Sequence, residues 1–398
     1  MTPATKSTTP LTKTKFFSVC TGKLAKGCSE CVQGRKLVLF VTGLCAQRCF
    51  YCPVSEQKFS DDSVYANEWK IKDSKNPVEL FEEARVTGAR GCGITGGDPL
   101  MRIDRTVEYI TLLKKKFSKS FHIHLYTPLK LVTEEKLEKL FDAGLDEIRF
   151  HPDLDDNSLW EKIGLAKKYS WTVGIEIPAI PGYTEKTKKL IDFISNKISD
   201  KVSNTVSFIN LNELELSDTD AKHYRLHELG FIPKNDTSYG VKGSKETALI
   251  LLKYAQEKNI SGHFCTAKLK DSVQVKKRLE IRAQNTKLPF DIATTDGTLI
   301  RGCIYLPALC PGMKYRERLK QANRNQLISE LTEKKKELQT LFVLKEEDIF
   351  LDTIKLRLIT NAIFLKKHKN ALKKMKLAPA IVEEFPTADA FEVDVLFL

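Results

Sequence analysis

Residues 45–52 read Cys45-Ala46-Gln47-Arg48-Cys49-Phe50-Tyr51-Cys52 and follow directly on the apolar run Leu37-Val38-Leu39-Phe40-Val41. Three cysteines with C-x3-C-x2-C spacing on one loop supply three thiolates, enough for three irons of a [4Fe–4S] cube. A structural zinc site would instead need a fourth ligand close by, usually in a paired C-x2-C pattern. The spacing therefore predicts an open iron–sulfur cluster, whose fourth iron has no ligand from this loop and can bind a small molecule.

Outward from this loop, short apolar strands alternate with helical stretches. Strands are predicted at 36–42, 90–95, 121–127, 146–151, 172–178 and 205–211, with helices between them at 77–88, 103–118, 133–143, 156–169 and 184–198. Successive βα units pair in parallel through right-handed crossovers. The predicted fold class is therefore α/β, a partial (β/α)6 TIM-like barrel over residues 36–216. A doubly wound sheet is the alternative on pattern alone.

Unusual residues fall where a barrel would place a functional site, at the carboxyl ends of its strands. Beyond the cysteine loop, these residues are Gly96, Gly97, Asp98, Thr127, Arg149, His151, Glu176 and Asn212. Two glycines without Cβ atoms let the backbone approach a ligand closely. Arg149 is a natural partner for a carboxylate. We therefore expect one binding site at this end of the barrel.

Three segments, taken together, resemble the radical S-adenosylmethionine (radical SAM) superfamily. The cysteine motif has an aromatic residue, Tyr51, just before its third cysteine, as is common there. Gly96-Gly97-Asp98-Pro99 is similar to the superfamily's Gly-Gly-Glu-Pro segment, with Asp in place of Glu. Ile180-Pro181-Gly182-Tyr183-Thr184-Glu185 is similar to the Val-Pro-Gly-x-Thr-Asp stretch of pyruvate formate-lyase activating enzymes and their relatives. The resemblance covers about residues 36–216.

The resemblance implies a [4Fe–4S] cluster on Cys45, Cys49 and Cys52, with SAM bound at its free iron. One electron, from a donor such as ferredoxin or flavodoxin, would cleave SAM to methionine and a 5′-deoxyadenosyl radical, which takes a hydrogen atom from the substrate. It further implies cofactor contacts for Tyr51, Gly96, Gly97, Asp98, Thr127, Arg149, His151, Glu176 and Asn212. For each strand-end residue, a structural hydrogen bond or a substrate contact is the alternative, and Glu176 stands where activating enzymes tend to be basic.

A second group of cysteines, Cys20, Cys28 and Cys31, lies in a tail and Cys-rich extension over residues 1–35. With Cys265 or His263 as fourth ligand, they predict a second metal site, either a zinc ion or a second iron–sulfur cluster. Cysteines packed in a small core are the alternative. Ten cysteines without an apparent secretory signal fit a reducing cytoplasm. The sequence contains no apolar run of about 18 residues, so it predicts no membrane-spanning helix.

The net charge of +13 is unevenly distributed. Residues 301–380 hold 18 Lys plus Arg against 8 Asp plus Glu, whereas the last 18 residues hold five acids and no base. We expect a smaller, basic α+β domain over residues 217–398. A basic surface attracts polyanions, nucleic acid first, although a solvated lysine-rich surface is an equally simple interpretation.

Three functions are compatible with these features. The first is a radical SAM enzyme acting on a macromolecule, with RNA favoured by the basic region. The second is an activating enzyme that installs a glycyl radical on a protein partner, which the Pro-Gly-Tyr-Thr-Glu match suggests. The third is a non-catalytic metal-cluster protein that binds nucleic acid, although such a module has no need of the Gly-Gly-Asp-Pro segment.

Overall fold

The computed structural model describes residues 10–195 and 206–398 and divides the chain into two compact units, with the boundary between Val275 and Lys276. The sequence pattern places that boundary after residue 216 instead. Residues 217–275 belong to the first unit because they add a helix and a further strand to its sheet. Parts of the predicted N-terminal tail (1–9), of the helix at 184–198 (from 196) and of the strand at 205–211 (residue 205) lie outside the described residues.

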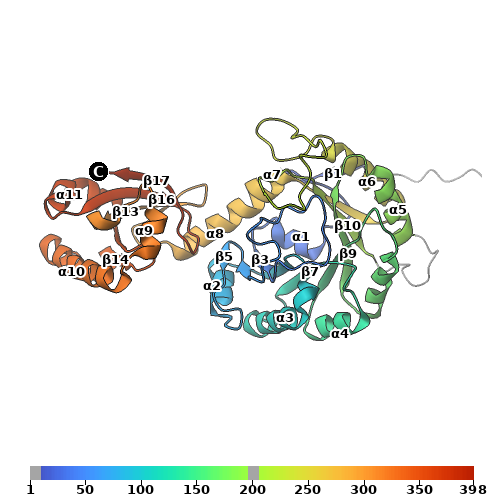
Figure 1. Ribbon diagram of the computed structural model, residues 1–398, viewed down its shortest axis with the longest axis horizontal. Helices are drawn as coiled ribbons and strands as arrows, with labels where there is room; N and C mark the ends of the chain where they lie inside the picture. Colours follow the sequence, from blue (N-terminus) through green and yellow to red (C-terminus); the bar gives the residue numbers. More distant parts are fainter. Residues whose placement is uncertain (1–9, 196–205) are drawn as a thin grey trace, which may run out of the picture. The chain divides into compact units, whose positions relative to one another are not determined.

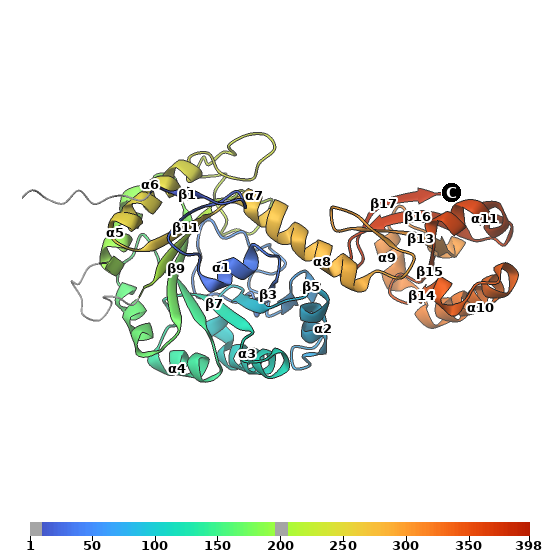
Figure 2. The ribbon, with the colours of Figure 1, turned by 180° about the vertical axis from the view of Figure 1, so that it is seen from behind.

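The first unit is built on a parallel sheet (Figures 1 and 2). Its parallel strands, in spatial order, are β3 (Lys36–Phe40), β6 (Gly91–Thr95), β7 (His122–Pro128), β8 (Glu147–His151), β9 (Thr172–Ala179), β10 (Phe208–Glu213) and β11 (Ser261–Cys265). Spatial order follows chain order, without the reversal that marks a doubly wound sheet. The predicted partial barrel is thus confirmed, with β11 as an additional parallel strand.

Short antiparallel strands continue the sheet at both ends. Beyond β3 lie β4 (Tyr65–Ala66) and β5 (Trp69–Lys70), and beyond β11 lie β2 (Val19–Thr21) and β1 (Thr12–Lys13). Among the described residues, β3 and β11 pair with these strands rather than with each other. The barrel is therefore open along one side.

Helices cover the outer face of the parallel strands, as Figure 1 shows. They are α2 (Val78–Val86), α3 (Ile103–Phe117), α4 (Glu134–Asp142), α5 (Thr184–Ser195) and α6 (Ser244–Glu257). The predicted helix at 156–169 forms instead a 3-10 helix, Trp160–Lys168. In α4 the Oγ1 of Thr133 accepts a hydrogen bond from the backbone N–H of Lys136, the N-cap contact that satisfies a free helix-end donor. Gly144, with φ +98°, follows the helix end.

A six-residue helix, α1 (Lys26–Cys31), lies in the lumen of the barrel toward the amino ends of the strands (Figure 1). The backbone N–H of Gly27 donates to Glu147, and a Cβ at Gly27 would lie 2.6 Å from Arg149 Nη2 and 2.5 Å from His124 Nδ1. Polar side chains from β7 and β8 therefore point inward and pack on α1. The Cys-rich extension is thus part of the barrel core.

The second unit is α+β. Its antiparallel sheet has the order β14 (Ile349–Asp352), β15 (Arg357–Thr360), β13 (Leu299–Tyr305), β16 (Ala378–Glu384), β17 (Glu392–Phe397), with β12 (Ile292–Ala293) paired to β13. The helices are α8 (Lys276–Thr286), α9 (Tyr315–Gln321), α10 (Arg324–Phe342) and α11 (Ala362–Lys374). Fully buried Arg357 binds both carboxylate oxygens of Glu384, at 2.6 and 2.8 Å. In neither unit is any described helix long and apolar enough to cross a bilayer.

The lumen contains a buried lysine, Lys36, whose pKa lies well below that of an exposed lysine. The Nζ of Lys36 lies 2.8 Å from His122 Nδ1 and donates to the His122 carbonyl oxygen at 2.6 Å. Burial lowers the pKa of Lys36 to about 8. The folded state therefore releases this proton at a lower pH than the unfolded chain does, and the cost of burying the charge is relieved as pH rises.

We predict that the stability of the wild type relative to Lys36→Met rises by up to about 3 kcal/mol between about pH 8 and pH 10.5. Urea unfolding followed by circular dichroism at several pH values measures this difference. Lys23 is exposed, so Lys23→Met should show no such trend. A wild-type advantage that is constant across the range would contradict the prediction.

Candidate functional site

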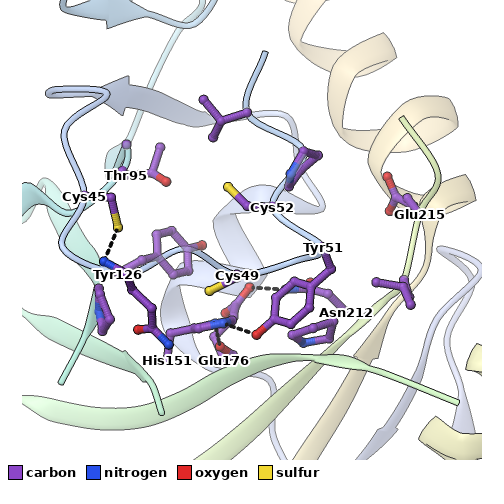
Figure 3. A pocket seen from close by; sticks show the side chains of 18 of the residues that line it. Cys45, Cys49, Tyr51, Cys52, Thr95, Tyr126, His151, Glu176, Asn212 and Glu215 are labelled. Carbon is purple, nitrogen blue, oxygen red and sulfur yellow. Dashed lines mark hydrogen bonds between the residues drawn. The ribbon is translucent and has the colours of Figure 1, made fainter. Parts of the chain in front are cut away.

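A cavity of about 360 Å³ lies at the carboxyl ends of the barrel strands (Figure 3). Its wall combines the cysteine loop after β3 with strand ends from β6 to β10 and with Lys270. The predicted site residues that line it are Cys45, Cys49, Tyr51, Cys52, Gly96, Gly97, Thr127, His151, Glu176 and Asn212. The structure thus brings together residues that are up to about 170 positions apart in the chain.

The three motif cysteines face the same part of this cavity, as their sulfur atoms in Figure 3 show. All three are free thiols. Burial raises the pKa of the Cys49 thiol to about 12 and also raises the pKa values of Cys45 and Cys52. Without a cation these groups stay protonated, and a metal would replace their protons. Neutral, partly exposed thiols on one cavity wall are the donor set that an iron–sulfur cluster needs.

Three thiols on one cavity wall match the three cysteine ligands of an open [4Fe–4S] cluster. A structural zinc would need a fourth protein ligand. In a [4Fe–4S] cube each thiolate binds its own iron, so the three sulfurs stand apart around the cube. The residues present therefore fit the cluster.

Gly96 and Gly97 are required by the contact between β6 and the cysteine loop. The N–H of Gly97 donates to the Thr42 carbonyl at 2.8 Å, and the next N–H, of Asp98, donates to the Leu44 carbonyl at 2.8 Å. A Cβ on Gly97 would lie 2.4 Å from the Leu44 carbonyl oxygen. The two glycines therefore let the backbone of β6 hold the start of the cysteine loop, in addition to lining the cavity.

Asp98 lies behind the cavity wall rather than on it. Its Oδ1 accepts from Thr127 Oγ1 at 2.8 Å and from the Leu100 N–H at 3.0 Å, where it caps a 3-10 helix, Pro99–Arg102. Its Oδ2 is buried without a partner among the described residues. Burial raises the pKa of Asp98 to about 6. These contacts give Asp98 a structural role at the end of β6, different from the cofactor contact that the resemblance implies.

Tyr51 is fixed by a hydrogen-bonded chain that starts at β9. The Nδ1 of His151 lies 2.7 Å from the Glu176 carbonyl oxygen and must donate to it. Burial lowers the pKa of His151, so the ring is neutral and its Nε2 is an acceptor. The Tyr51 hydroxyl, 2.8 Å away, donates to that nitrogen. The backbone between Cys49 and Cys52 is thereby tied to the strand ends.

Glu176 presents a fixed carboxylate to the cavity. Its Oε2 accepts from Arg149 Nη1 at 2.6 Å, and its Oε1 accepts from Asn212 Nδ2 at 3.0 Å. Arg149 is buried and also donates through Nε to Glu147 at 2.6 Å. Arg149 therefore lies below the cavity floor and positions Glu176, so it is not itself exposed to a ligand there.

The sequence did not indicate several other cavity residues, including Tyr126, Phe59 and Glu215. Lys270 pairs with Glu215 at 2.5 Å and begins a π-helix, Lys270–Val275. A π-turn often marks a functional site. The mixed cations and acceptors around Lys270 fit a substrate-facing helix and a solvated helix equally well, and the fold places Lys270 on the cavity wall.

The predicted second metal site stays a prediction, because the described residues show no close group of three ligands there or at Cys45, Cys49 and Cys52. Cys28 points into the lumen, where its Sγ lies 3.4 Å from Arg149 Nη2 and 3.9 Å from Asn210 Oδ1. The thiol thus has a cationic neighbour, the Arg149 guanidinium. His263 is the register partner of Cys20, but its Nδ1 is taken by Asn210 Oδ1 at 2.6 Å. These groups form a polar core around α1.

Sequence comparisons find proteins that are similar to this chain, one of them over almost its full length. The model of the radical SAM superfamily matches residues 39–218. A protein of Methanocaldococcus jannaschii, assigned provisionally as a glycyl-radical enzyme activating enzyme, is 36% identical over 96% of this chain and 94% of its own length. A GTP 3′,8-cyclase of Staphylococcus aureus is 33% identical over 32% of this chain and 37% of its own length.

Two solved structures show partial similarity to this chain. One is a maturase of [FeFe]-hydrogenase, with 15% identity over 65% of each chain and a TM-score of 0.37. Another is a radical SAM methyltransferase of Kitasatospora setae, solved with tryptophan and a SAM analogue. It has 13% identity over 49% of this chain and 39% of its own, and a TM-score of 0.34.

We predict that Gly97→Ala weakens the first unit by about 1–3 kcal/mol, because the new methyl group forces the backbone of β6 and the cysteine loop apart. Urea unfolding measures the loss, and iron per chain after reconstitution should fall in parallel. Gly312→Ala is the control for iron content. A Cβ there meets nothing within 4 Å, and the backbone strain that a side chain causes at its φ of +147° falls in the second unit. Unchanged stability and iron content in Gly97→Ala would show that the close contact is not needed.

Proposed function

Because the chain belongs to the radical SAM superfamily, we propose that this enzyme activates a glycyl-radical enzyme by taking a hydrogen atom from a backbone glycine of that partner. The superfamily uses a [4Fe–4S] cluster and SAM, and membership leaves no support for the non-catalytic alternative. The observation that carries the proposal is the 36% identity to the M. jannaschii relative, which extends through both units. That relative's own assignment names this activity.

In the proposed site, Cys45, Cys49 and Cys52 hold the cluster. When bound, the cluster supplies the electron that cleaves SAM to methionine and a 5′-deoxyadenosyl radical. The glycines of β6 hold the cysteine loop, and the Glu176 carboxylate, oriented by hydrogen bonds from Arg149 and Asn212, faces a cationic or hydroxyl group of the ligand. We assign Tyr51, Thr127 and His151 to the same ligand contact, because all three line the cavity.

The enzyme's remaining task is to keep the radical away from solvent. Two residues on the cavity wall near β10 form an ion pair, Glu215 with Lys270. Their charged groups can form hydrogen bonds with polar groups of an incoming peptide. Carboxylate and ammonium groups recognise backbone amides through hydrogen bonds. We further propose that the electron comes from a small cytoplasmic donor such as ferredoxin or flavodoxin, and that the protein acts in the cytoplasm.

The first test is cleavage of SAM by the reconstituted protein under anaerobic conditions with dithionite. We expect 5′-deoxyadenosine and methionine from the wild type. Cys45→Ser, Cys49→Ser and Cys52→Ser should each lose cluster iron and at least about 100-fold of this activity, since a missing ligand removes cofactor and chemistry together. Cys310→Ser, a partly buried thiol of the second unit, is the matched control and should keep both. Retention of iron by the triple variant would refute the ligand assignment.

The second test addresses the partner. Wild-type enzyme, SAM and reductant are incubated anaerobically with extract of the source cells, and electron paramagnetic resonance (EPR) then looks for the doublet of a glycyl radical. Air should cleave the radical-bearing chain at that glycine, which mass spectrometry of the protein fraction identifies. Modified nucleosides in the RNA fraction without a protein radical would contradict glycyl-radical activation.

A specific feature of the second unit favours RNA as the second candidate substrate. Six lysines of α11 and its C-terminal end are exposed and form no ion pair within the described residues; they are Lys366, Lys367, Lys369, Lys373, Lys374 and Lys376. Lys366, Lys369 and Lys373 recur at i, i+3 and i+7 and so share one face of the helix. Such a row suits the phosphates of a nucleic acid backbone.

If α11 binds RNA, the logarithm of tRNA affinity should fall linearly with the logarithm of salt concentration. Replacing Lys366, Lys369 and Lys373 by Gln should reduce that slope by about 0.7–0.9 for each lysine that contacts a phosphate. The control replaces Lys334 and Lys345, which pair with Glu337 and Glu347. Equal slopes for both variants, or no tRNA binding, would remove the support for RNA.

A further inference from the structure

The sheet of the second unit ends in β17, and that edge is open. β17 pairs with β16 on one side, and no strand pairs with its other side among the described residues (Figures 1 and 2). Three of its side chains are large, apolar and about half exposed, namely Val393 at 50%, Leu396 at 56% and Phe397 at 45%. An apolar strand edge without a partner is a template for a further strand. β17 is therefore a candidate docking site for an extended chain.

The other sheet edges of the protein are protected in ways that β17 is not. The sheet of the first unit ends in β1 and β5, strands of two residues that each contain a lysine. Short strands, lysines and a covering helix are all means of blocking edge pairing. At the opposite edge of the second unit's sheet, α10 packs beside β14. β17 has six residues and contains neither lysine nor proline.

The backbone groups of β17 that point away from β16 can be assigned residue by residue. In an antiparallel pair, successive residues direct their N–H and carbonyl groups alternately toward the partner strand and away from it. The Leu398 N–H donates to the Pro379 carbonyl of β16 at 3.0 Å. Val395 and Phe397 therefore direct their groups to the open edge. Consistent with this, the Val395 N–H donates to Oδ1 of its own neighbour, Asp394, at 2.9 Å.

We propose that β17 pairs in antiparallel orientation with β17 of a second copy of this chain, with the two-fold axis at Val395. The two Val395 residues then bond each other through N–H and carbonyl groups that both direct to the edge. In this register Asp394 lies opposite the partner subunit's Leu396, so no like charges oppose each other. Glu392, the other acid of the strand, is already paired with Lys355 at 2.9 Å. A surface that pairs with itself about a two-fold axis closes the assembly at a dimer.

Sedimentation equilibrium of the full chain tests this proposal, and we expect a dimer that dissociates on dilution. Val395→Pro removes the N–H that points to the edge and leaves the bonds to β16, so it should abolish the dimer while the circular dichroism spectrum stays that of the wild type. Met313→Ala removes an apolar side chain that is 91% exposed elsewhere in the second unit. This control should still dimerise. A wild type that stays monomeric at every soluble concentration would overturn the proposal.

Hydrogen exchange of the wild type, read by mass spectrometry, is a second test that does not depend on the folding of any variant. The Val395 and Phe397 amides should exchange more slowly as protein concentration rises, because pairing covers them. The exposed loop at Gly312 and Met313 is the internal reference and should exchange at a constant rate. Exchange in β17 that is independent of concentration would overturn self-pairing. Slower exchange only after addition of cell extract would also overturn it and assign the edge to a different protein.

Discussion

The Arg149 guanidinium, buried in the lumen of the barrel, is the interaction on which the rest of the site depends. It binds Glu147 and Glu176 at the same time and lies beside Cys28 of α1. Burying a single charge is costly, but a cation held between two carboxylates offsets much of that cost. Glu147 also accepts a hydrogen bond from the Gly27 N–H. The same network therefore fixes α1 in the lumen and the Glu176 carboxylate at the cavity.

The cysteine loop has no regular secondary structure, so its conformation must be imposed from outside. Three neighbours do this. The glycine pair of β6 holds its start, the Tyr51–His151 hydrogen bond holds its middle, and the segment between β10 and α6, residues 214–243, covers its far side. A loop that is tied at three places loses little further conformational freedom when it binds a cofactor, which favours affinity. The protein thus prepares the loop before any cluster is present.

Residue pattern and spacing were sufficient to predict the barrel, the cysteine motif and ten of the residues that line the cavity. Alternating apolar strands and helix end signals such as Thr133 and Gly144 are local, and parallel strands bring their carboxyl ends together by topology alone. The failures came from long-range packing. β11 was missed because Ser261-Gly262-His263-Phe264-Cys265 carries no apolar run. The second metal site stays a prediction, and nothing local reveals that the Arg149 guanidinium lies beside Cys28. The place of Lys270 on the cavity wall depends on tertiary contacts.

The position of α1 has a consequence for how turnover proceeds. Since this helix fills the amino end of the lumen, traffic into the cavity runs through the opposite end, where the strands finish. SAM and the proposed macromolecular partner would both use this end. In that case SAM binds before the partner does, and the products of SAM cleavage leave only after the partner dissociates.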